Sequence, residues 1–375
     1  MAELFGNAYA GRRVLITGHT GFKGSWLVEW LLMLGAEVSG YALEPPTDPS
    51  LFDELGLAER LTRHVIGDVR DLAHLREVIR AAAPEIVFHL AAQPLVRLSY
   101  ETPVETYETN VMGTVNLLEA ARSCPSVRAI VVVTSDKCYE NRETGHAYRE
   151  GDAMGGYDPY SSSKGCAELV TAAYRRSFYG EASPVRIASV RAGNVIGGGD
   201  WAADRIVPDC IRALEAGAPI VVRNPDAVRP WQHVLEPLSG YLYLGSRMLG
   251  GSADFDGPWN FGPEEQGTVP VREVADAIVA AWGSGTWTTP PQPGGPHEAH
   301  LLVLDITKVH EHLGWRPLYP VARTLEVTAA WYAARHEGAD IVAITGADIT
   351  AYADEAVRTG AVWANDRTTG SEQTT

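Results

Sequence analysis

A glycine-rich turn near the N-terminus constrains the fold of this chain more than any other feature. The turn reads Thr17-Gly18-His19-Thr20-Gly21-Phe22-Lys23-Gly24. An apolar run over 13–17 precedes it, apolar residues at helical spacing follow over 22–34, and a second strand is expected over 36–43. In such a β-α-β unit, glycine permits positive φ and lets helix N-terminal amides approach a pyrophosphate. The turn predicts a dinucleotide site, and a turn that serves only packing is the alternative.

The alternation of strand and helix continues along the chain. The pattern predicts strands over 64–66, 85–90, 128–135 and 185–191, and helices over 72–83, 104–122 and 159–176. Strands separated by helices form a parallel sheet that is covered on both faces. The predicted fold class is α/β: a doubly wound parallel Rossmann sheet with a smaller C-terminal α/β substrate-binding region.

The composition changes after Gly193. Glycines and prolines predict loops and small elements there: Gly197, Gly198, Gly199, Pro208, Pro219, Pro225, Pro230 and Pro237. Further on, we expect a helix over 271–282, a linker over 287–296 and a strand over 301–304. Residues 11–193 are therefore expected to form mainly the nucleotide-binding domain. Residues 194–345 are expected to bind substrate, with some chain crossing back to the sheet, and the polar tail 365–375 to be disordered.

Charge and cysteine usage exclude several classes of partner. The formal net charge is -16, and no run of Lys or Arg is long enough to follow a nucleic-acid backbone. The four cysteines lack the paired spacing of a zinc site, so we expect no metal and a reduced, cytoplasmic protein. No apolar run approaches the length of about 18 residues that a membrane helix needs, and no signal peptide is evident.

The end of the second strand bears on the choice of cofactor. It reads Ser39-Gly40-Tyr41-Ala42-Leu43-Glu44, without an obvious acidic partner for a ribose. No Arg stands there to receive a 2′-phosphate, although Lys23 could approach one, so NAD is favoured over NADP. After the third strand, Asp68 and Val69 are placed to meet the adenine edge, and an ordinary strand-end turn is the alternative.

Candidate catalytic residues fall into two groups. Tyr160 and Lys164 are one helical turn apart, so both emerge on the same face, where a cation lowers the pKa of a phenol and makes it a better base. Ser135, Asp136 and Lys137 follow a Val-rich strand. Because ligands bind at the carboxyl ends of parallel strands, we expect both groups to line one cleft. A solvated helix face and a polar turn are the respective alternatives.

Several longer strings resemble the extended short-chain dehydrogenase/reductase superfamily. They are the glycine-rich turn, His89-Leu90-Ala91-Ala92-Gln93, Asn110-Val111-Met112-Gly113-Thr114, Ser135 and the Tyr160/Lys164 pair. Within it, four strings resemble the CDP-glucose 4,6-dehydratases: Thr134-Ser135-Asp136-Lys137-Cys138-Tyr139-Glu140-Asn141, Asp158-Pro159-Tyr160, Arg191-Ala192-Gly193-Asn194-Val195-Ile196-Gly197-Gly198-Gly199-Asp200-Trp201 and Arg229-Pro230-Trp231-Gln232-His233-Val234. The resemblance covers most of residues 11–335. Lys137 stands where dTDP-glucose dehydratases carry Glu, which favours the CDP-sugar branch.

The resemblance implies a lyase that oxidises C4 of a nucleotide sugar, eliminates water across C5 and C6, and returns the hydride to C6. Tyr160, helped by Lys164 and Ser135, takes the O4 proton. Lys137 removes the C5 proton and Asp136 protonates the leaving hydroxyl. These last two roles demand a neutral Lys and a protonated Asp, against ordinary pKa values of about 10.4 and about 3.9.

The resemblance also implies the binding residues. For NAD they are Gly18, Thr20, Gly21, Phe22, Lys23, Gly24, Asp68, Val69, Leu90, Ala91, Ala92, Gln93, Thr109, Tyr160 and Lys164. For the nucleotide sugar they are Asn194 and Arg229 at the diphosphate, and more weakly Arg205, Arg223, His233 and His297. A turn-forming Asn, surface arginines and exposed loop histidines are the alternatives.

Other functions stay open on the sequence alone. A sugar-nucleotide 4-epimerase or reductase has the same fold, but an epimerase has no use for an acid and a base at C5 and C6. A dehydratase acting on dTDP- or UDP-glucose is also possible. A non-catalytic dinucleotide sensor would not need Tyr160, Lys164 or the Ser135–Lys137 cluster. The helices over 104–122 and 159–176 resemble those that pair in homodimers of this superfamily, and packing on the sheet is the alternative.

Overall fold

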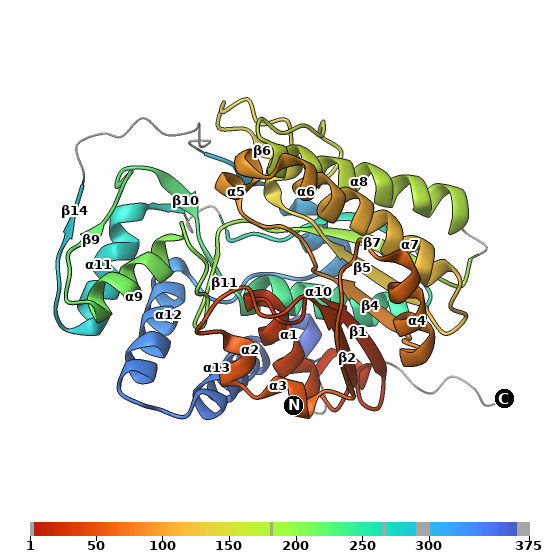
Figure 1. Ribbon diagram of the computed structural model, residues 1–375, viewed down its shortest axis with the longest axis horizontal. Helices are drawn as coiled ribbons and strands as arrows, with labels where there is room; N and C mark the ends of the chain where they lie inside the picture. Colours follow the sequence, from red (N-terminus) through yellow and green to blue (C-terminus); the bar gives the residue numbers. More distant parts are fainter. Residues whose placement is uncertain (1–3, 181–182, 265–267, 290–300, 366–375) are drawn as a thin grey trace.

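The computed structural model describes residues 4–180, 183–264, 268–289 and 301–365. Its centre is a seven-stranded sheet in the order β12-β7-β5-β4-β1-β2-β3, with every neighbouring pair parallel (Figure 1). The strands are β1 (Arg13–Thr17), β2 (Glu37–Ala42), β3 (Arg63–Ile66), β4 (Ile86–His89), β5 (Ala129–Val133), β7 (Arg186–Arg191) and β12 (Gly257–Asn260). The predicted doubly wound Rossmann sheet is confirmed.

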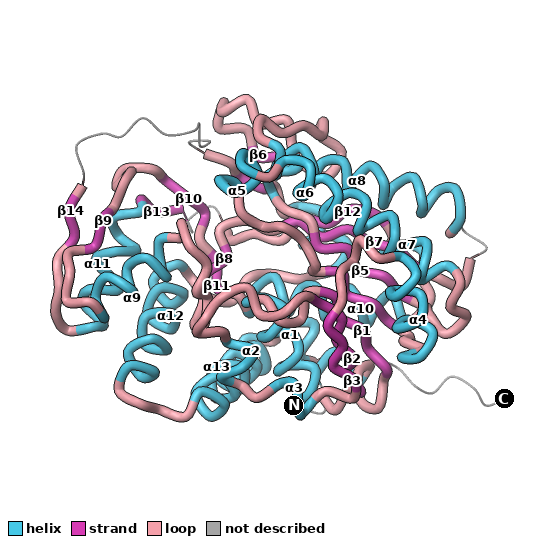
Figure 2. The backbone as a smooth tube through the Cα atoms, viewed as in Figure 1, coloured by secondary structure: helices cyan, strands magenta, loops and turns pink. Residues whose placement is uncertain are grey.

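Helices cover both faces of the sheet (Figure 2). One layer contains α4 (Leu72–Ala82), α7 (Gly113–Arg122) and α8 (Pro159–Phe178), and the other contains α1 (Phe22–Met33) and α10 (Leu235–Leu249). Successive strand residues alternate between the two cores, as the period of a strand requires. This burial on both sides is why the strands are continuous apolar runs.

The predicted helix over 104–122 is one helical stretch with an irregular turn in its middle. It comprises α6 (Pro103–Tyr107), a π-helical turn η2 (Glu108–Met112) and α7. Within η2, the Asn110 side chain accepts from the Gln93 amide at 2.8 Å and donates to the Ser163 hydroxyl at 2.9 Å. The π-turn thus ties this stretch to the loop after β4 and to α8.

The expectation of loops and small elements after Gly193 holds for short strands over 195–196, 220–221, 228–230 and 232–233, but it missed the helices of this region. The helices are α9 (Ile206–Glu215), α10, α11 (Val271–Trp282), α12 (Val321–His336) and α13 (Ile341–Thr359). Of these, α11 was expected over 271–282 and is confirmed. Pro208 and Pro237 lie in the first turns of α9 and α10, where the missing N–H costs no helical hydrogen bond. These two prolines therefore mark helix starts, whereas Pro230 lies in the short strand over 228–230. α9, α11 and α12 gather beside the sheet (Figure 1).

One short strand lies where the expected linker begins. β14 (Trp287–Thr288) pairs in parallel with β9 (Ile220–Val221), so the start of the expected linker is structured. The expected strand over 301–304 is β15 (Val303–Leu304), which pairs with β6 (Ala147–Tyr148). The remainder of the linker and the tail 366–375 lie outside the described residues.

Smaller elements complete the described chain. They are η1 (Leu4–Asn7), α2 (Leu51–Glu54), α3 (Leu57–Arg60), α5 (Val96–Glu101), η3 (Asp136–Cys138), β8 (Val195–Ile196), β10 (Val228–Pro230), β11 (Gln232–His233), η4 (Ala253–Phe255), β13 (Thr268–Pro270), η6 (Val309–Leu313) and η7 (Val362–Ala364). Among the helices of the described ranges, none is long and apolar enough to span a membrane.

Candidate active site

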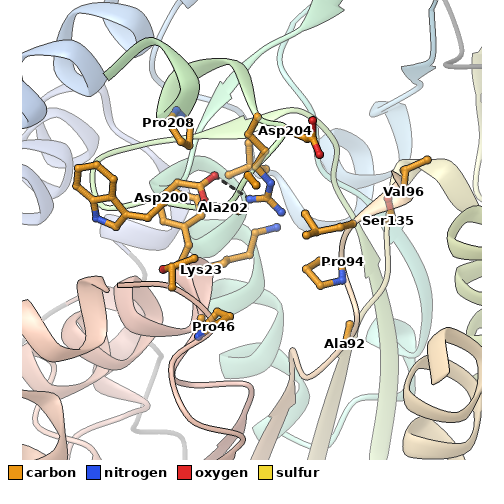
Figure 3. A pocket seen from close by; sticks show the side chains of 18 of the residues that line it. Lys23, Pro46, Ala92, Pro94, Val96, Ser135, Asp200, Ala202, Asp204 and Pro208 are labelled. Carbon is orange, nitrogen blue, oxygen red and sulfur yellow. Dashed lines mark hydrogen bonds and ion pairs between the residues drawn. The ribbon is translucent and has the colours of Figure 1, made fainter. Parts of the chain in front are cut away.

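A cavity of about 710 Å³ lies at the carboxyl-terminal edge of the sheet. The segments that directly follow β1, β4, β5 and β7 all line it, because parallel strands end at the same edge. Figure 3 shows Ser135 and Pro94 on one side of the cavity and Asp200 and Pro208 on the other. The cavity thus lies between the Rossmann sheet and the helices that follow Gly193.

The glycine-rich turn forms one end of the cavity, and its shape fits a dinucleotide. Gly18 has φ +76°, and a Cβ there would lie 2.6 Å from the Ala91 nitrogen. A Cβ on Gly24 would lie 2.2 Å from the Gly18 carbonyl oxygen. α1 begins directly afterwards with Gly21 as its N-cap and no side-chain cap, which leaves its first amides available to an anion. The turn can therefore hold the pyrophosphate of NAD against backbone amides.

Nearly all of the expected cofactor residues line this cavity. They are Gly18, Thr20, Gly21, Phe22, Lys23, Gly24, Asp68, Val69, Leu90, Ala91, Ala92, Thr109, Tyr160 and Lys164. Gln93 is the exception, and its expected role in cofactor binding is corrected here. Its buried side chain donates to the Thr106 hydroxyl at 2.9 Å and so shapes the loop after β4 instead. Glu44 was not predicted, yet it lines the cavity two residues after β2. Its position after the second strand was the available signal.

Tyr160 and Lys164 both face the cavity from the start of α8. Asp158 caps this helix by accepting from the Ser161 amide at 2.9 Å. Burial lowers the pKa of Lys164 to about 8, and its ammonium donates to the Val133 carbonyl at 3.3 Å. Burial raises the pKa of Tyr160 to about 12, although a hydrogen bond with Ser135 opposes that shift. The expected lowering of the Tyr160 pKa is therefore wrong, because desolvation outweighs the lowering effects of Ser135 and Arg205.

Ser135 organises the turn that follows β5. Its hydroxyl accepts from the Lys137 amide at 3.2 Å and donates to the Asp136 carboxylate at 2.9 Å. Asp136 is buried against Gly193, where an added Cβ would lie 1.8 Å from its Oδ2. Lys137 is half-buried and lines the same cavity as Tyr160. The two candidate catalytic groups therefore meet in one place.

A buried ion pair holds α8 against the sheet. The Arg191 guanidinium donates to the Glu168 carboxylate at 2.8 Å, and both side chains are almost fully buried. Glu168 also accepts from Thr134 at 2.5 Å and from Ser189 at 2.7 Å. Burial opposes the charge of Glu168, but Arg191 outweighs it and holds the pKa of Glu168 below its ordinary value. Because Glu168 lies one turn after Lys164, this pair fixes the position of the Tyr-Lys face.

Lys23 extends from the first turn of α1 into the cavity (Figure 3). Its pKa is lowered to about 7, mainly by burial and then by the charges of Arg205 and Lys164, while Asp136 opposes the shift. Its ammonium lies 5.7 Å from the centre of the Tyr241 ring. Its charge state therefore changes near neutral pH.

Four of the expected substrate residues line the far end of the cavity: Asn194, Arg205, Arg223 and Arg229. Arg205 pairs with Asp200 at 2.8 Å. Asp204 pairs with Arg223 at 2.9 Å and, across the cavity, with Arg97 at 3.5 Å. Arg97, Asp200 and Asp204 were not predicted from the sequence, because only the fold brings them to the cavity.

The structure contradicts the expected role of His233 in substrate binding. Its ring is fully buried, lies 5.9 Å from both the Trp26 and Tyr319 rings, and does not line the cavity. His297 lies outside the described residues. Across the described ranges, no cluster of three or more His, Cys, Asp or Glu side chains could hold a metal ion.

The fold and the cavity define a class: a Rossmann protein whose buried Tyr-Lys pair faces a dinucleotide cradle. A model of the NAD dependent epimerase/dehydratase family matches residues 14–251. The chain therefore belongs to this family, within the extended short-chain dehydrogenase/reductase superfamily.

Individual relatives agree with this assignment. The chain is 50% identical to the CDP-glucose 4,6-dehydratase of Salmonella typhimurium, over 94% of this chain and 99% of that protein. It is 28% identical to the UDP-glucose 4-epimerase of Mycolicibacterium smegmatis, over 85% of this chain and 98% of that protein. Among solved structures, it is similar to DesIV, a dTDP-glucose 4,6-dehydratase from Streptomyces venezuelae with NAD and TYD bound. That match has a TM-score of 0.72 and 25% identity, and covers 87% of this chain and 97% of DesIV.

Proposed function

We propose that this chain is an NAD-dependent CDP-glucose 4,6-dehydratase, a hydro-lyase that forms CDP-4-keto-6-deoxyglucose for deoxysugar biosynthesis. The observation that carries the proposal is that Asp136 and Lys137 line the same cavity as Tyr160 and Lys164. One pair suits oxidation of an alcohol, and the other suits removal of water. The identity of 50% with a CDP-glucose 4,6-dehydratase supports the same reaction and the same nucleotide.

The cradle of Gly18, Gly21 and Gly24 would hold the NAD pyrophosphate, and Glu44 would accept from a ribose hydroxyl. When bound there, NAD would supply a reversible hydride acceptor for the reaction. Leu90, Ala91 and other apolar side chains exclude water from that end of the cavity.

Oxidation at C4 falls to Tyr160, whose phenol oxygen takes the O4 proton. Lys164 stabilises negative charge on the phenol, and its carbonyl partner on β5 holds the ammonium in place. Ser135 lines the same cavity and opposes the rise in the pKa of the Tyr160 phenol. The resulting 4-ketone makes the C5 proton acidic.

Elimination falls to the turn after β5. Lys137 takes the C5 proton, and Asp136 gives a proton to the C6 oxygen as the C6–O bond breaks. Lys137 then returns its proton to C5. The hydrogen bond from Ser135 and the contact with Gly193 hold the Asp136 carboxyl at one position in the cavity.

Substrate recognition falls to residues 194–345. Asn194 and Arg229 would bind the diphosphate, and Arg205 and Arg223 would supply further positive charge against an otherwise acidic protein. The ion pairs of Arg205 and Arg223 with Asp200 and Asp204 limit that charge and fix both guanidinium groups.

Product formation from defined substrates tests the proposal. The protein is incubated with NAD and, separately, CDP-, dTDP- or UDP-glucose, and the alkaline absorbance of a 4-keto-6-deoxy sugar is measured. We expect product from CDP-glucose. A 4-epimer without 6-deoxy product would favour the epimerase interpretation that the M. smegmatis relative suggests. No product from any of the three would refute the dehydratase proposal.

We also propose that the protein is a cytoplasmic homodimer that pairs through α6–α8. Apolar side chains there are exposed, with Val104 at 70%, Leu169 at 58% and Met112 at 49%. All four cysteines are free, which fits a reducing compartment. Sedimentation should give a dimer for the wild-type chain and a monomer for Leu169→Glu. Val357→Glu, at an exposed apolar residue of α13, is the control and should stay dimeric.

A further inference from the structure

Three consecutive glycines separate β8 from α9, and the proposed function gives them no role. Gly197, Gly198 and Gly199 open a loop that runs to Arg205, and most of this loop lines the active cavity. Its last residue, Arg205, is among the arginines proposed to bind the nucleotide sugar, so any role of the loop in binding rests on that proposed function. A loop that ends at a binding arginine can set where that arginine lies.

The side chains behind the loop explain why glycines stand there. A Cβ on Gly198 would clash with the Trp331 ring of α12, so this ring packs directly on the loop backbone. Gly199 has φ +77°, in the left-handed region that favours glycine, and a Cβ there would lie 2.7 Å from Leu51 Cδ1 of α2. The glycines thus let α2 and α12 approach the loop backbone closely.

Two aromatic side chains bind the carbonyl groups of the loop. Trp26 of α1 donates its indole N–H to the Gly198 carbonyl at 2.9 Å. The Tyr332 hydroxyl of α12 donates to the Asp200 carbonyl at 2.6 Å and lies 3.3 Å from the Gly197 carbonyl. Both aromatic side chains are fully buried. Because a buried carbonyl without a partner is costly, these bonds fix the loop between α1 and α12.

Asp200 extends this order from the loop backbone to Arg205. Its carboxylate accepts from the Arg205 guanidinium at 2.8 Å and from the Ala202 amide at 3.2 Å. The Asp200 side chain is 6% exposed, whereas that of Arg205 is 35% exposed and lines the cavity. A chain of contacts therefore leads from the Tyr332 hydroxyl behind the loop, through a buried carboxylate, to a guanidinium inside the cavity.

We propose that Tyr332 is a positioning residue for binding of the nucleotide sugar. It fixes the Asp200 backbone, Asp200 fixes the Arg205 guanidinium, and Arg205 meets the diphosphate of the ligand. A long arginine side chain loses conformational freedom when it binds, and a guanidinium that is held beforehand loses less of it. The gain is in affinity and not in chemistry, because Tyr332 itself does not line the cavity.

A second acid of the same loop offers a rival route to the diphosphate. Asp204 pairs with Arg223 at 2.9 Å, and Arg223 also lines the cavity. The Tyr332 hydroxyl binds the backbone four residues earlier, at Asp200, so the Asp204–Arg223 pair should not depend on it. An Arg223→Gln background separates the two routes.

The test is a double-mutant cycle in which calorimetry measures the binding of CDP in the presence of NAD. Tyr332→Phe removes only the hydroxyl, and Arg205→Gln removes the charge at the other end of the chain of contacts. Tyr9→Phe is the matched control, because the Tyr9 hydroxyl is equally buried and donates to the Leu242 carbonyl at 2.6 Å, away from the cavity. The melting temperature, and kcat and KM for CDP-glucose, are measured on the same proteins.

Tyr332→Phe should weaken CDP binding by about threefold to tenfold and raise KM for CDP-glucose by a similar factor, with little change in kcat. In the Arg205→Gln background the same substitution should have no further effect, whereas in the Arg223→Gln background it should keep its full effect. Tyr9→Phe should lower the melting temperature about as much as Tyr332→Phe does, but it should leave CDP binding unchanged.

Several results would overturn this role of Tyr332. They are unchanged CDP affinity in Tyr332→Phe, an equal loss of CDP affinity in Tyr9→Phe, a full effect of Tyr332→Phe in the Arg205→Gln background, and a fall in kcat without a rise in KM. If Tyr332→Phe does not fold, Asp200→Asn tests the next link through the same cycle. Failure of the proposed function is distinct, because wild type would then form no 6-deoxy product, while CDP binding would still report on Arg205.

Discussion

The two proposed catalytic pairs line one cavity, but the chain holds them in different ways. Tyr160 and Lys164 project from a helix of 20 residues that the buried Arg191–Glu168 pair ties to the sheet. Asp136 and Lys137 belong to a 3-10 turn of three residues. The proposed oxidation site is thus built into the main layers of the fold, whereas the groups proposed for elimination depend on a short turn. A few residues after β5 can therefore decide the fate of the oxidised sugar.

The largest expected effect comes from Tyr160→Phe. Removing the phenol oxygen removes the acceptor of the O4 proton, so turnover should fall by about a thousandfold or more. No reduced nicotinamide should form on mixing with CDP-glucose. NAD binding by calorimetry is the control and should change little. A variant that keeps a tenth of the activity or more would mean that another group takes this proton.

Lys137→Ala should separate elimination, assigned to Asp136 and Lys137, from oxidation, assigned to Tyr160 and Lys164. Without the amine, the C5 proton stays in place, so formation of the 6-deoxy product should fall by about a hundredfold or more while reduced nicotinamide still forms. Lys137→Arg is the matched variant, because it keeps the charge but cannot act as a base near neutral pH. Both variants should fail alike. Activity in the Arg variant would assign Lys137 an electrostatic role only.

Arg229→Ala should weaken substrate binding without altering either chemical step. Loss of a charge-assisted contact with the diphosphate should raise KM for CDP-glucose by about tenfold to a hundredfold, with a small change in kcat. Steady-state kinetics measures both. Arg358→Ala is the control, because this exposed arginine pairs with Glu355 within α13 and should leave KM unchanged. A fall in kcat alone would place Arg229 in the chemistry instead.

The smallest effect on activity is expected from Glu236→Gln, which lies outside both pairs. Glu236 accepts from the Tyr319 amide at 2.6 Å and from the Tyr352 hydroxyl at 2.8 Å, and burial raises its pKa to about 7. A raised pKa means that the folded state binds the proton more tightly, so stability is lost as pH rises from about 4.5 through about 7.

This loss should reach about 3 kcal/mol in wild type and should be absent from Glu236→Gln. Denaturant unfolding across that pH range measures it in both proteins. Equal pH dependence in the two proteins would show that Glu236 does not titrate in this window.

The sequence predicted the sheet well because its information is local. Apolar runs and helical spacing between residues 13 and 191 specify strands that are buried on both faces, and the glycine turn fixes where they bind a ligand. The region after Gly193 was less predictable. Pro208 and Pro237 occur at helix starts as readily as in loops, and only tertiary packing distinguishes the two cases.

The direction in which a side chain points was also beyond the sequence. Gln93 and His233 lie within strings that resemble the family, yet the fold turns Gln93 toward Thr106 and buries His233 beside Trp26. The pKa of Tyr160 depends on how deeply α8 is packed, so spacing alone gave the wrong direction. The ion pair between Arg97 and Asp204 joins two segments that are far apart in the sequence, so no local sequence pattern could predict it.

CDP-glucose deuterated at C4 offers the most direct test of the claim that separate residues carry oxidation and elimination. With wild type, mass spectrometry should find the deuterium at C6 of the 6-deoxy product. With Lys137→Ala it should find the deuterium on reduced nicotinamide, beside a 4-keto sugar that retains its C6 hydroxyl. Deuterium that stays at C4 in Lys137→Ala, or reaches C6 as efficiently as in wild type, would contradict the account.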